Sequence, residues 1–503
     1  MRVRFNQQIK LGVTPISEVK LDSRSRHGLV PVLRALQYVF ITPDLSEEVF
    51  KILEKKIKDG LQETGRYGMS MWELLVFGVL RMTENADFDK LYDLGNEHNS
   101  VRGILGVRKS DYTVEKKYHL QTIKDNVRLL DDATIYKISA IVVEGSHGLI
   151  KKKEGVDCLN LRIKGDSFVV ESKIHFPTDL NLLYDSLRKS LSTMSYFQNS
   201  ALDLLCNYHC ANWQKKVRNK YRSSSEIHRK KGRDYQFRLE NSVNLYLQVS
   251  KEVLVRGKNI LLELVVKEGL TDGLTKREEQ KLSDLKFYLS MVEKHIDLVH
   301  RRIILGETIP HGEKIFSIFE KHVEWNSKGK LNKGVELGHN VLLATDQYNN
   351  ILYTEVYEHQ VDKSRTINLG NKLTEQYGEV HNMESISLDR NFYSSPAEKS
   401  LSNQFKIVVL PKSGRPSQLE LAKSGDENYQ KIKRKHSGVE GNINQLEQNG
   451  LDICPDKGIE GFKRYVAYGV LSYNLHQLGM RLILAERESV KTAQRKRKRL
   501  KAA

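Results

Sequence analysis

The chain has 503 residues, of which 39% are hydrophobic, and a formal net charge of +18. At about 100–200 residues per domain, this length predicts roughly two to five compact units, and the hydrophobic content excludes a wholly disordered chain. Nine prolines and an ordinary glycine content exclude collagen-like and proline-rich architectures. The positive excess favours a polyanionic partner, which is either nucleic acid or an anionic membrane surface.

The sequence argues against a membrane location. A spanning helix needs about 20 consecutive apolar residues, and the best long run, Val466–Leu484, is interrupted by polar side chains. The N-terminus lacks the apolar stretch of a secretory signal. Four scattered cysteines do not predict a disulfide framework, which fits a cytoplasmic location. Cys206, His209 and Cys210 have no second ligand pair and favour a structural helix face over a zinc site.

The N-terminal part of the chain is basic and then helical. Residues 1–43 predict a partly ordered basic arm, and residues 44–130 repeat apolar side chains at helical spacing. Ser46 and Ser70 each mark the expected start of a helix. A helical domain over 44–130 in a basic protein favours a DNA-binding module, and a dimerisation or packing domain is the alternative.

The pattern then changes to strands, separated by a long helical block. Residues 159–172 predict a strand, Thr178 or Asp179 then caps a helix, and helical periodicity continues to about residue 304. A hairpin follows at 335–345 and 351–357, and then a helix at 365–377. Two strands at 385–388 and 405–410 come next, and helices at 428–448 and 461–488 complete the pattern.

This order predicts an α/β fold. Three antiparallel strands followed by two strands that are each reached through a helix resemble an RNase H-like sheet, although other α/β folds fit the same strand count. We expect a discontinuous catalytic core over 155–185 plus 310–480, an all-helical insertion over 186–305 and a basic C-terminal tail over 489–503.

Two basic clusters predict phosphate contacts, with a solvated helix face as the alternative for each. The segment 213–238 carries ten Lys and Arg against two acids, and residues 491–501 add seven basic residues without an acid. The candidate DNA-binding residues are Lys215, Lys216, Arg218, Lys220, Arg222, Arg229, Lys230, Lys231 and Arg233 in the insertion, and Lys433, Arg434 and Lys435 further on.

Three carboxylates stand where this fold would carry chemistry. Asp166 is inside a half-apolar strand, where a carboxylate is costly unless it is paired or metal-bound. Asp389 ends a strand, the place where ligands bind in α/β sheets, and Glu440 lies in a basic helix. Mg²⁺ prefers oxygen ligands, and two ions about 3.5–4 Å apart can activate a water or a 3′-hydroxyl. Alone, each acid is an ordinary turn, cap or surface residue.

Other acids compete for the same role. Asp179 is most simply a helix cap and Asp346 a turn residue. Glu171, Asp185 and Glu447 each fit a solvated or salt-bridged position.

Several motifs carry a resemblance to a known family. They are GDSFVVES (165–172), HFPTDLNLLYD (175–185), FSIFEKHVEWNSKGK (316–330), VELGHN (335–340), LDRNFYSS (388–395), HSGVEGNINQLE (436–447) and GFKRYVAYGVLSYNLH (461–476). With them the chain resembles an insertion-sequence transposase of the DDE class, particularly the ISNCY-type group, over about residues 44–479.

The resemblance implies a function and a site. Asp166, Asp389 and Glu440 would be the catalytic residues and the ligands of Mg²⁺, with two ions and Mn²⁺ as a substitute. The expected activity is cleavage and strand transfer at terminal inverted repeats, with target DNA as a second partner, a nucleoid association and a homodimer or larger complex. Related transposases often have a basic residue seven positions after the glutamate. Glu447 stands there, so phosphate anchoring falls to 433–435.

Two further functions stay open at this point. A catalytically silent repeat-binding protein derived from a transposase would keep the basic clusters without cleavage. An RNase H-like nuclease would cleave without transposing. Trp213 or Trp325 could stack on an unpaired base, and packing is the alternative for both.

Overall fold

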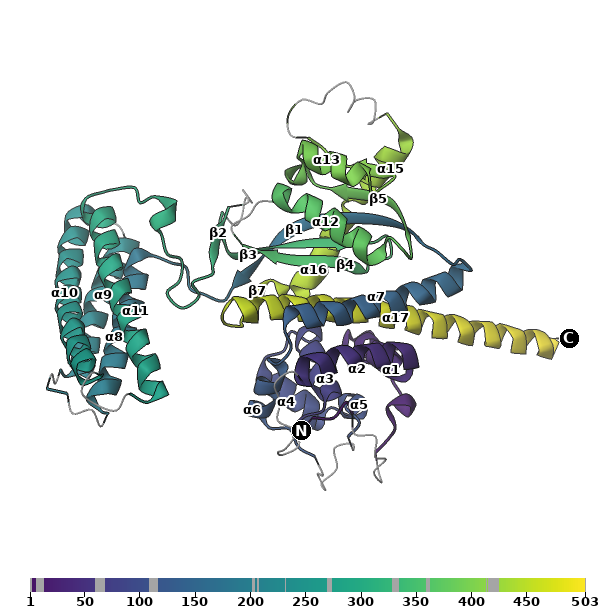
Figure 1. Ribbon diagram of the computed structural model, residues 1–503, viewed down its shortest axis with the longest axis horizontal. Helices are drawn as coiled ribbons and strands as arrows, with labels where there is room; N and C mark the ends of the chain where they lie inside the picture. The colour runs from purple at the N-terminus through teal and green to yellow at the C-terminus, as the bar shows by residue number, and fades with distance from the viewer. Residues whose placement is uncertain are drawn as a thin grey trace. The chain divides into compact units, whose positions relative to one another are not determined.

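The chain forms two compact units, which are described separately (Figure 1). The core unit comprises residues 1–173 and 324–503, and the helical unit comprises residues 174–323. In the computed structural model the described residues are 2–5, 13–58, 68–107, 116–200, 204–205, 208–230, 232–268, 274–327, 334–358, 362–412, 414 and 425–502.

The helical unit contains four long helices within its described residues, and they pack around an apolar core of their own. The α8 N-cap is Thr178, whose side chain accepts a hydrogen bond from the Asn181 amide, and α11 begins with a capping box at Thr275. The elements are α8 (Asp179–Gln198), α9 (Cys210–Arg229), α10 (Tyr235–Glu268), α11 (Lys276–Val299), η2 (His300–Ile304) and η3 (His311–Glu313).

The N-terminal part of the core unit is helical. As predicted, Ser70 caps a helix, in a capping box with Glu73. The helix expected to begin at Ser46 begins instead at Pro43. The fixed backbone φ angle of proline suits the first position of a helix. The elements are η1 (Ile16–Glu18), α1 (Leu29–Ile41), α2 (Pro43–Lys58), α3 (Met71–Thr83), α4 (Phe88–Glu97), α5 (Asn99–Ile104), α6 (Leu120–Val127) and α7 (Asp132–Glu154).

The structure differs from the expected basic arm at α1, which carries a run of buried apolar residues. Its apolar side packs on α17 (Ile459–Ala502), a helix distant in sequence. The two backbones approach closely at Gly479, where a Cβ would lie 1.8 Å from the Pro31 carbonyl oxygen. The prediction of a basic arm missed α1 because α17, the helix that buries it, begins more than 400 residues later in the sequence.

The rest of the core unit is a mixed sheet with its helices, so the predicted α/β class is confirmed. The described strands are β1 (Asn160–Ser172), β2 (Glu324–Asn326), β3 (Glu336–Thr345), β4 (Ile351–Tyr357), β5 (Asn382–Leu388), β6 (Ile407–Val409) and β7 (Ile453–Cys454). The helices are α12 (Asp362–Tyr377), η4 (Arg390–Phe392), α13 (Ser395–Ser402), α15 (Glu427–Lys435), α16 (Gly438–Leu446), η5 (Glu447–Leu451) and α17.

Strand β1 is central in this sheet. On one side β3 is antiparallel to β1, and β4 and β2 are both antiparallel to β3. On the other side β5 is parallel to β1, and β6 is parallel to β5. The short β7 pairs in parallel with the last residues of β1.

The two faces of the sheet are covered by different helices (Figure 1). Leu161 and Ile163 of β1 share a core with α12 and α13. Phe168 and Val170 share the larger core with α16, α17 and the N-terminal helices. No helix among the described parts of the chain combines the length and apolar character that crossing a membrane requires.

Candidate functional site

Strand register brings two of the predicted acids together. Gly165 of β1 is paired with Leu388 of β5 in a parallel ladder, so the next position on each chain is Asp166 and Asp389. Neighbours in register on parallel strands point to the same face of the sheet. Both aspartates are partly buried.

A glycine allows β5 to approach β1 at this point. A Cβ on Gly165 would lie 2.8 Å from Cδ2 of Leu388 and 3.1 Å from the carbonyl oxygen of Leu343. Glycine is therefore the residue that this close approach requires, and it stands directly before Asp166 in β1.

The two aspartates lie where the sheet opens. β5 ends at Leu388, but β1 continues to Ser172, and β7 pairs with it only from Glu171. Between these points, residues 166–170 of β1 have no strand partner on this side among the described residues. Ligands of α/β sheets bind outside the carboxyl ends of strands at such openings.

Helix α16 crosses the same face of the sheet. Val439 and Ile443 belong to the core that contains Phe168. The Asn442 side-chain amide donates to the Thr345 hydroxyl of β3 at 3.1 Å and accepts a hydrogen bond from the Tyr473 hydroxyl at 3.1 Å. These contacts fix the helix against the sheet.

The turn before α16 contacts the residues next to the aspartates. Nδ1 of His436 is 3.2 Å from the Ser387 hydroxyl, and a Cβ on Gly438 would lie 2.6 Å from Nζ of Lys164. Lys164 is the register partner of Ser387, one row before the aspartates. The single helix predicted over 428–448 is thus two helices, α15 and α16, which are joined by a turn at 436–437. This turn contacts β1 and β5 through the residues just named.

Glu440 lies in the first turn of α16. Its side chain is exposed and makes no hydrogen bond or ion pair with any described residue. Within the described ranges, no three His, Cys, Asp or Glu side chains are grouped so that they could hold a metal ion. Strand register makes neighbours of two of the three acids, and the third is an exposed residue of α16.

The donor chemistry suits a hard divalent cation. Carboxylate oxygens are the ligands that Mg²⁺ takes, usually one or two together with waters, and Asp166 and Asp389 supply two on one face. Lys164 precedes Asp166 by two positions on that face. Burial lowers the pKa of Lys164, and the negative charge of Asp346 acts against this effect.

The competing acids have structural partners. Asp346 is fully buried in the β3–β4 turn, where it accepts hydrogen bonds from the Tyr348 and Asn350 amides at 2.8 Å and contacts Nε2 of His147 at 2.8 Å. It is a turn residue, as predicted. Asp179 is not the cap of α8, because Thr178 has that position, and it pairs with Arg302 at 2.8 Å.

Asp185 and the cysteine segment also have structural explanations. Asp185 is buried and pairs with His175 at 3.2 Å and Arg188 at 3.3 Å. Cys210 is buried at the start of α9, where its thiol donates to the Gln198 side-chain oxygen at 3.1 Å. Cys206 lies outside the described residues.

Four of the predicted DNA-binding residues form a stripe along α9. Lys215, Arg218, Arg222 and Arg229 follow one another by three, four and seven positions, which puts them on one helix face. All four are exposed and make no ion pair with any described residue. This basic α9 stripe is about 21 Å long at 1.5 Å per residue.

The other predicted residues of this segment differ in their surroundings. Lys216 pairs with Glu252 at 3.3 Å, and Lys230 pairs with Glu226 at 2.6 Å. Lys220 is half-buried and Arg233 exposed, and Lys231 lies outside the described residues. Both the Lys216 ammonium and the Arg256 guanidinium lie against the Trp213 ring, at 4.5 and 3.9 Å from its centre. These contacts favour the packing interpretation of Trp213.

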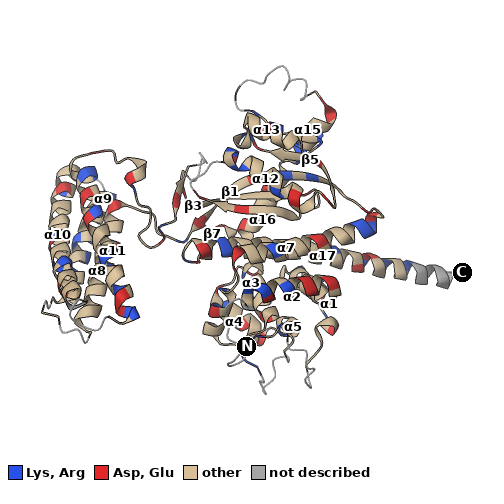
Figure 2. Cartoon of the chain, in the orientation of Figure 1, with Lys and Arg blue, Asp and Glu red and all other residues tan. Residues whose placement is uncertain are grey.

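The second basic cluster lies beside the opening in the sheet. Lys433, Arg434 and Lys435 are exposed in the last turn of α15, which contacts β5 and β6 (Figure 2). None of the three forms an ion pair with a described residue. They are therefore available to an anion near Asp389.

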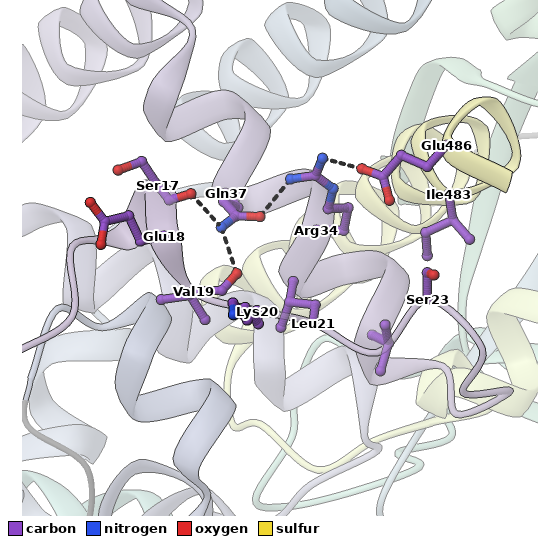
Figure 3. A pocket seen from close by; sticks show the side chains of 11 residues that line it. Ser17, Glu18, Val19, Lys20, Leu21, Ser23, Arg34, Gln37, Ile483 and Glu486 are labelled. Atoms are coloured by element: carbon purple, nitrogen blue, oxygen red, sulfur yellow. Dashed lines mark hydrogen bonds and ion pairs between the residues drawn. The ribbon is translucent and has the colours of Figure 1, made fainter. Parts of the chain in front are cut away.

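A separate pocket lies elsewhere in the core unit. It has a volume of about 240 Å³ and is bounded by the segment 17–23, α1 and α17 (Figure 3). Three of its polar side chains are linked, since Gln37 donates to the Val19 carbonyl at 3.0 Å and Arg34 donates to Gln37 at 2.6 Å and pairs with Glu486. The predicted site residues do not line this pocket.

Sequence reasoning gave His436, with Arg434 and Lys435, as a possible phosphate contact near Glu440, and it missed Lys164 and Ser387 around the aspartates. The alternation of β1 was a usable signal for Lys164, because it predicts that residues 164 and 166 share a face. Ser387 could not be found in this way, since its contact with His436 depends on how α15 and α16 pack.

No protein-family model matches the chain, and neither the curated proteins nor the solved structures contain a significant match. The function is therefore inferred from the residues and their arrangement.

Proposed function

We propose that the chain is a DNA transposase of the DDE class with an RNase H-like catalytic core. It would cleave DNA at terminal inverted repeats and transfer the cut strand, using Mg²⁺ or Mn²⁺. The proposal rests on the resemblance of its motifs and on one structural observation, the adjacency of Asp166 and Asp389 at the opening of the sheet.

The strand order supports the RNase H-like assignment. An antiparallel β1–β3–β4 set on one side of the sheet and parallel β5 and β6 on the other are what such a fold requires. The helix after them, α16, carries Glu440 and contacts β1.

In this proposal the carboxylates of Asp166 and Asp389 hold the metal, and Glu440 completes its ligands. A bound pair of divalent ions would activate the attacking oxygen and stabilise the leaving one. The chain's own residues orient the DNA: Lys433, Arg434 and Lys435 contact the phosphates next to the opening. Exposed cations without ion-pair partners suit this role because they lose no internal bond on binding phosphate.

The basic α9 stripe is proposed as a second phosphate-binding surface, and the helices over 44–130 as the part that grips the repeat. Each phosphate contact contributes about 0.9 to the slope of log affinity against log salt. Replacing Arg218 and Arg222 by alanine should lower that slope by about 1.8. Lys216→Ala should change it less, because Lys216 is paired with Glu252.

Cleavage of DNA that carries the element's ends tests the metal site. Asp389→Asn should reduce Mg²⁺-dependent cleavage at least about 1000-fold, because it removes a ligand charge from the site, while binding to the same DNA is unchanged. The matched control is Glu384→Gln on the same strand, whose carboxylate pairs with Arg162 at 2.8 Å. It should cleave as the wild type does.

The alternatives predict other results. Binding of the repeats without cleavage by the wild type would identify a silent repeat-binding protein. Cleavage without strand transfer would identify an RNase H-like nuclease. Equal loss of binding and cleavage in Asp389→Asn would contradict the assignment of Asp389 to a metal.

A further inference from the structure

A chain of three buried polar side chains joins helix α17, helix α16 and the sheet. The Tyr473 hydroxyl donates to the side-chain oxygen of Asn442, and the Asn442 side-chain nitrogen donates to the Thr345 hydroxyl, both at 3.1 Å. Thr345 is 0% exposed, Tyr473 1% and Asn442 6%. Because water cannot replace a partner at such a depth, the loss of either hydrogen bond leaves a buried polar group unsatisfied.

Helix α17 holds Tyr473 in place through its other polar contacts. Asn474, the next residue, accepts a hydrogen bond from the Ile351 amide at 2.8 Å and donates to the Ile351 carbonyl at 2.9 Å. Arg481 follows about two turns later and donates to the Asn350 side-chain oxygen at 3.1 Å. These contacts tie α17 to the β3–β4 hairpin, so the Tyr473 hydroxyl is a fixed donor for Asn442.

The same chain of contacts holds the backbone that carries Glu440. Glu440 stands two positions before Asn442 on α16, and residues at this spacing do not share a helix face. Asn442 is buried against the sheet, and Glu440 is exposed. On the other side of Glu440 in the sequence, Nδ1 of His436 lies 3.2 Å from the Ser387 hydroxyl of β5. Glu440 therefore lies between two residues that polar contacts attach to the sheet.

We propose that Tyr473 is a positioning residue for the proposed metal ligand Glu440 and acts on it through Asn442. This inference rests on the proposed function, in which Glu440 completes the ligands of the metal. Without the Tyr473 hydroxyl, the Asn442 oxygen loses its donor, and α16 would shift to bring that oxygen to another partner. Asp166 and Asp389 would keep their places, because strand register holds them. Residues that orient metal ligands typically contribute about 10–100-fold to metal affinity.

Manganese binding to the full chain without DNA tests the role of Tyr473. Tyr473→Phe removes only the hydroxyl and should raise the Mn²⁺ dissociation constant at least about 10-fold, as measured from the electron paramagnetic resonance signal of free Mn²⁺. The matched control is Tyr468→Phe on the same helix. Tyr468 is 2% exposed, and its hydroxyl makes no hydrogen bond with a described residue, so this variant should bind Mn²⁺ as the wild type does.

Thr345 tests the same chain of contacts from its other end. Thr345→Val keeps the shape of the side chain but removes the acceptor for Asn442, and it should weaken Mn²⁺ binding by a similar factor. Thr345→Ser keeps the hydroxyl and should restore the binding. Urea unfolding of each variant separates positioning from stability, since a merely structural role lowers the stability of Tyr473→Phe and Thr345→Val without changing their Mn²⁺ dissociation constants.

Asp389→Asn separates this inference from the proposed metal site. If Asp389→Asn weakens Mn²⁺ binding and Tyr473→Phe or Thr345→Val does not, the positioning role is overturned and the metal site stands. Equal binding by Thr345→Val and Thr345→Ser would also overturn it. If the wild type and Asp389→Asn bind Mn²⁺ alike, the metal site itself is wrong, and the inference falls with it.

Discussion

Burial favours the neutral form of three histidines. Burial lowers the pKa of His295, His381 and His476. For His381 the pKa falls to about 4, because burial is reinforced by electrostatic repulsion from His147 and Lys151, against the opposing effect of Asp346. As the pH falls, each of these histidines takes up a proton more readily in the unfolded chain than in the folded chain.

The lowered pKa values of the three histidines predict that the folded chain loses stability in mild acid. In the unfolded chain histidine titrates near pH 6.5, so between pH 6.5 and about 4 the unfolded state binds more protons than the folded state. The contribution of these histidines to the free energy of unfolding should therefore be fully present above about pH 6.5 and be lost as the pH decreases from 6.5 towards 4. Urea unfolding at a series of pH values measures it.

A substitution isolates the contribution of His381. His381→Gln should flatten the pH dependence of stability between pH 6.5 and 4, while the exposed His311 should have no such effect when it is changed to Gln. Equal slopes in the wild type and His381→Gln would contradict the role assigned to burial.

At the scale of elements, a buried ion pair joins the N-terminal helices to the end of the sheet. Arg81 of α3 donates two hydrogen bonds to Asp456, at 2.6 and 2.9 Å, and both side chains are nearly inaccessible. The Arg81 guanidinium also lies against the rings of Phe88 and Tyr465. Asp456 precedes α17, so this pair connects elements that are far apart in sequence.

Breaking this pair should be costly. Asp456→Asn leaves the buried guanidinium without its counter-charge and should lower the free energy of unfolding by about 3–5 kcal/mol. The exposed pair Lys153–Glu488 gives the control. Glu488→Gln should change the free energy of unfolding by less than about 1 kcal/mol. Chemical denaturation measures both, and similar losses in the two variants would show that burial does not decide the cost.

At the scale of the whole molecule, the two units have separate apolar cores. The core of the helical unit is formed by its own helices, and the described residues of that core come from 180–299. Units with separate cores unfold as separate cooperative transitions. Leu285 of α11 and Leu471 of α17 are each fully buried, one in each unit.

Calorimetry should therefore resolve two transitions. Leu285→Ala should lower the stability of one transition by about 2–5 kcal/mol through the cavity that it creates, and Leu471→Ala should act in the same way on the other. A single transition that both substitutions shift together would show that the units unfold as one.

Local pattern was sufficient for much of the secondary structure. The alternation of 159–172 predicted β1, the turn at 346–350 predicted the β3–β4 hairpin, and Ser70 predicted the start of α3. These signals work because side-chain period, turn residues and caps are properties of neighbouring residues. The short strands β2 and β7 were not predicted, since two or three residues show no period.

By itself the sequence determined most of the longer strands and helices, and which acids and cations stand at their ends. Only the tertiary structure decided that Asp389 lies beside Asp166, that the helix of Glu440 packs against β1, and that α1 is buried under α17. The physical reason is that strand register and helix packing are chosen by contacts between residues hundreds of positions apart, and a local pattern contains no record of which partners those contacts join.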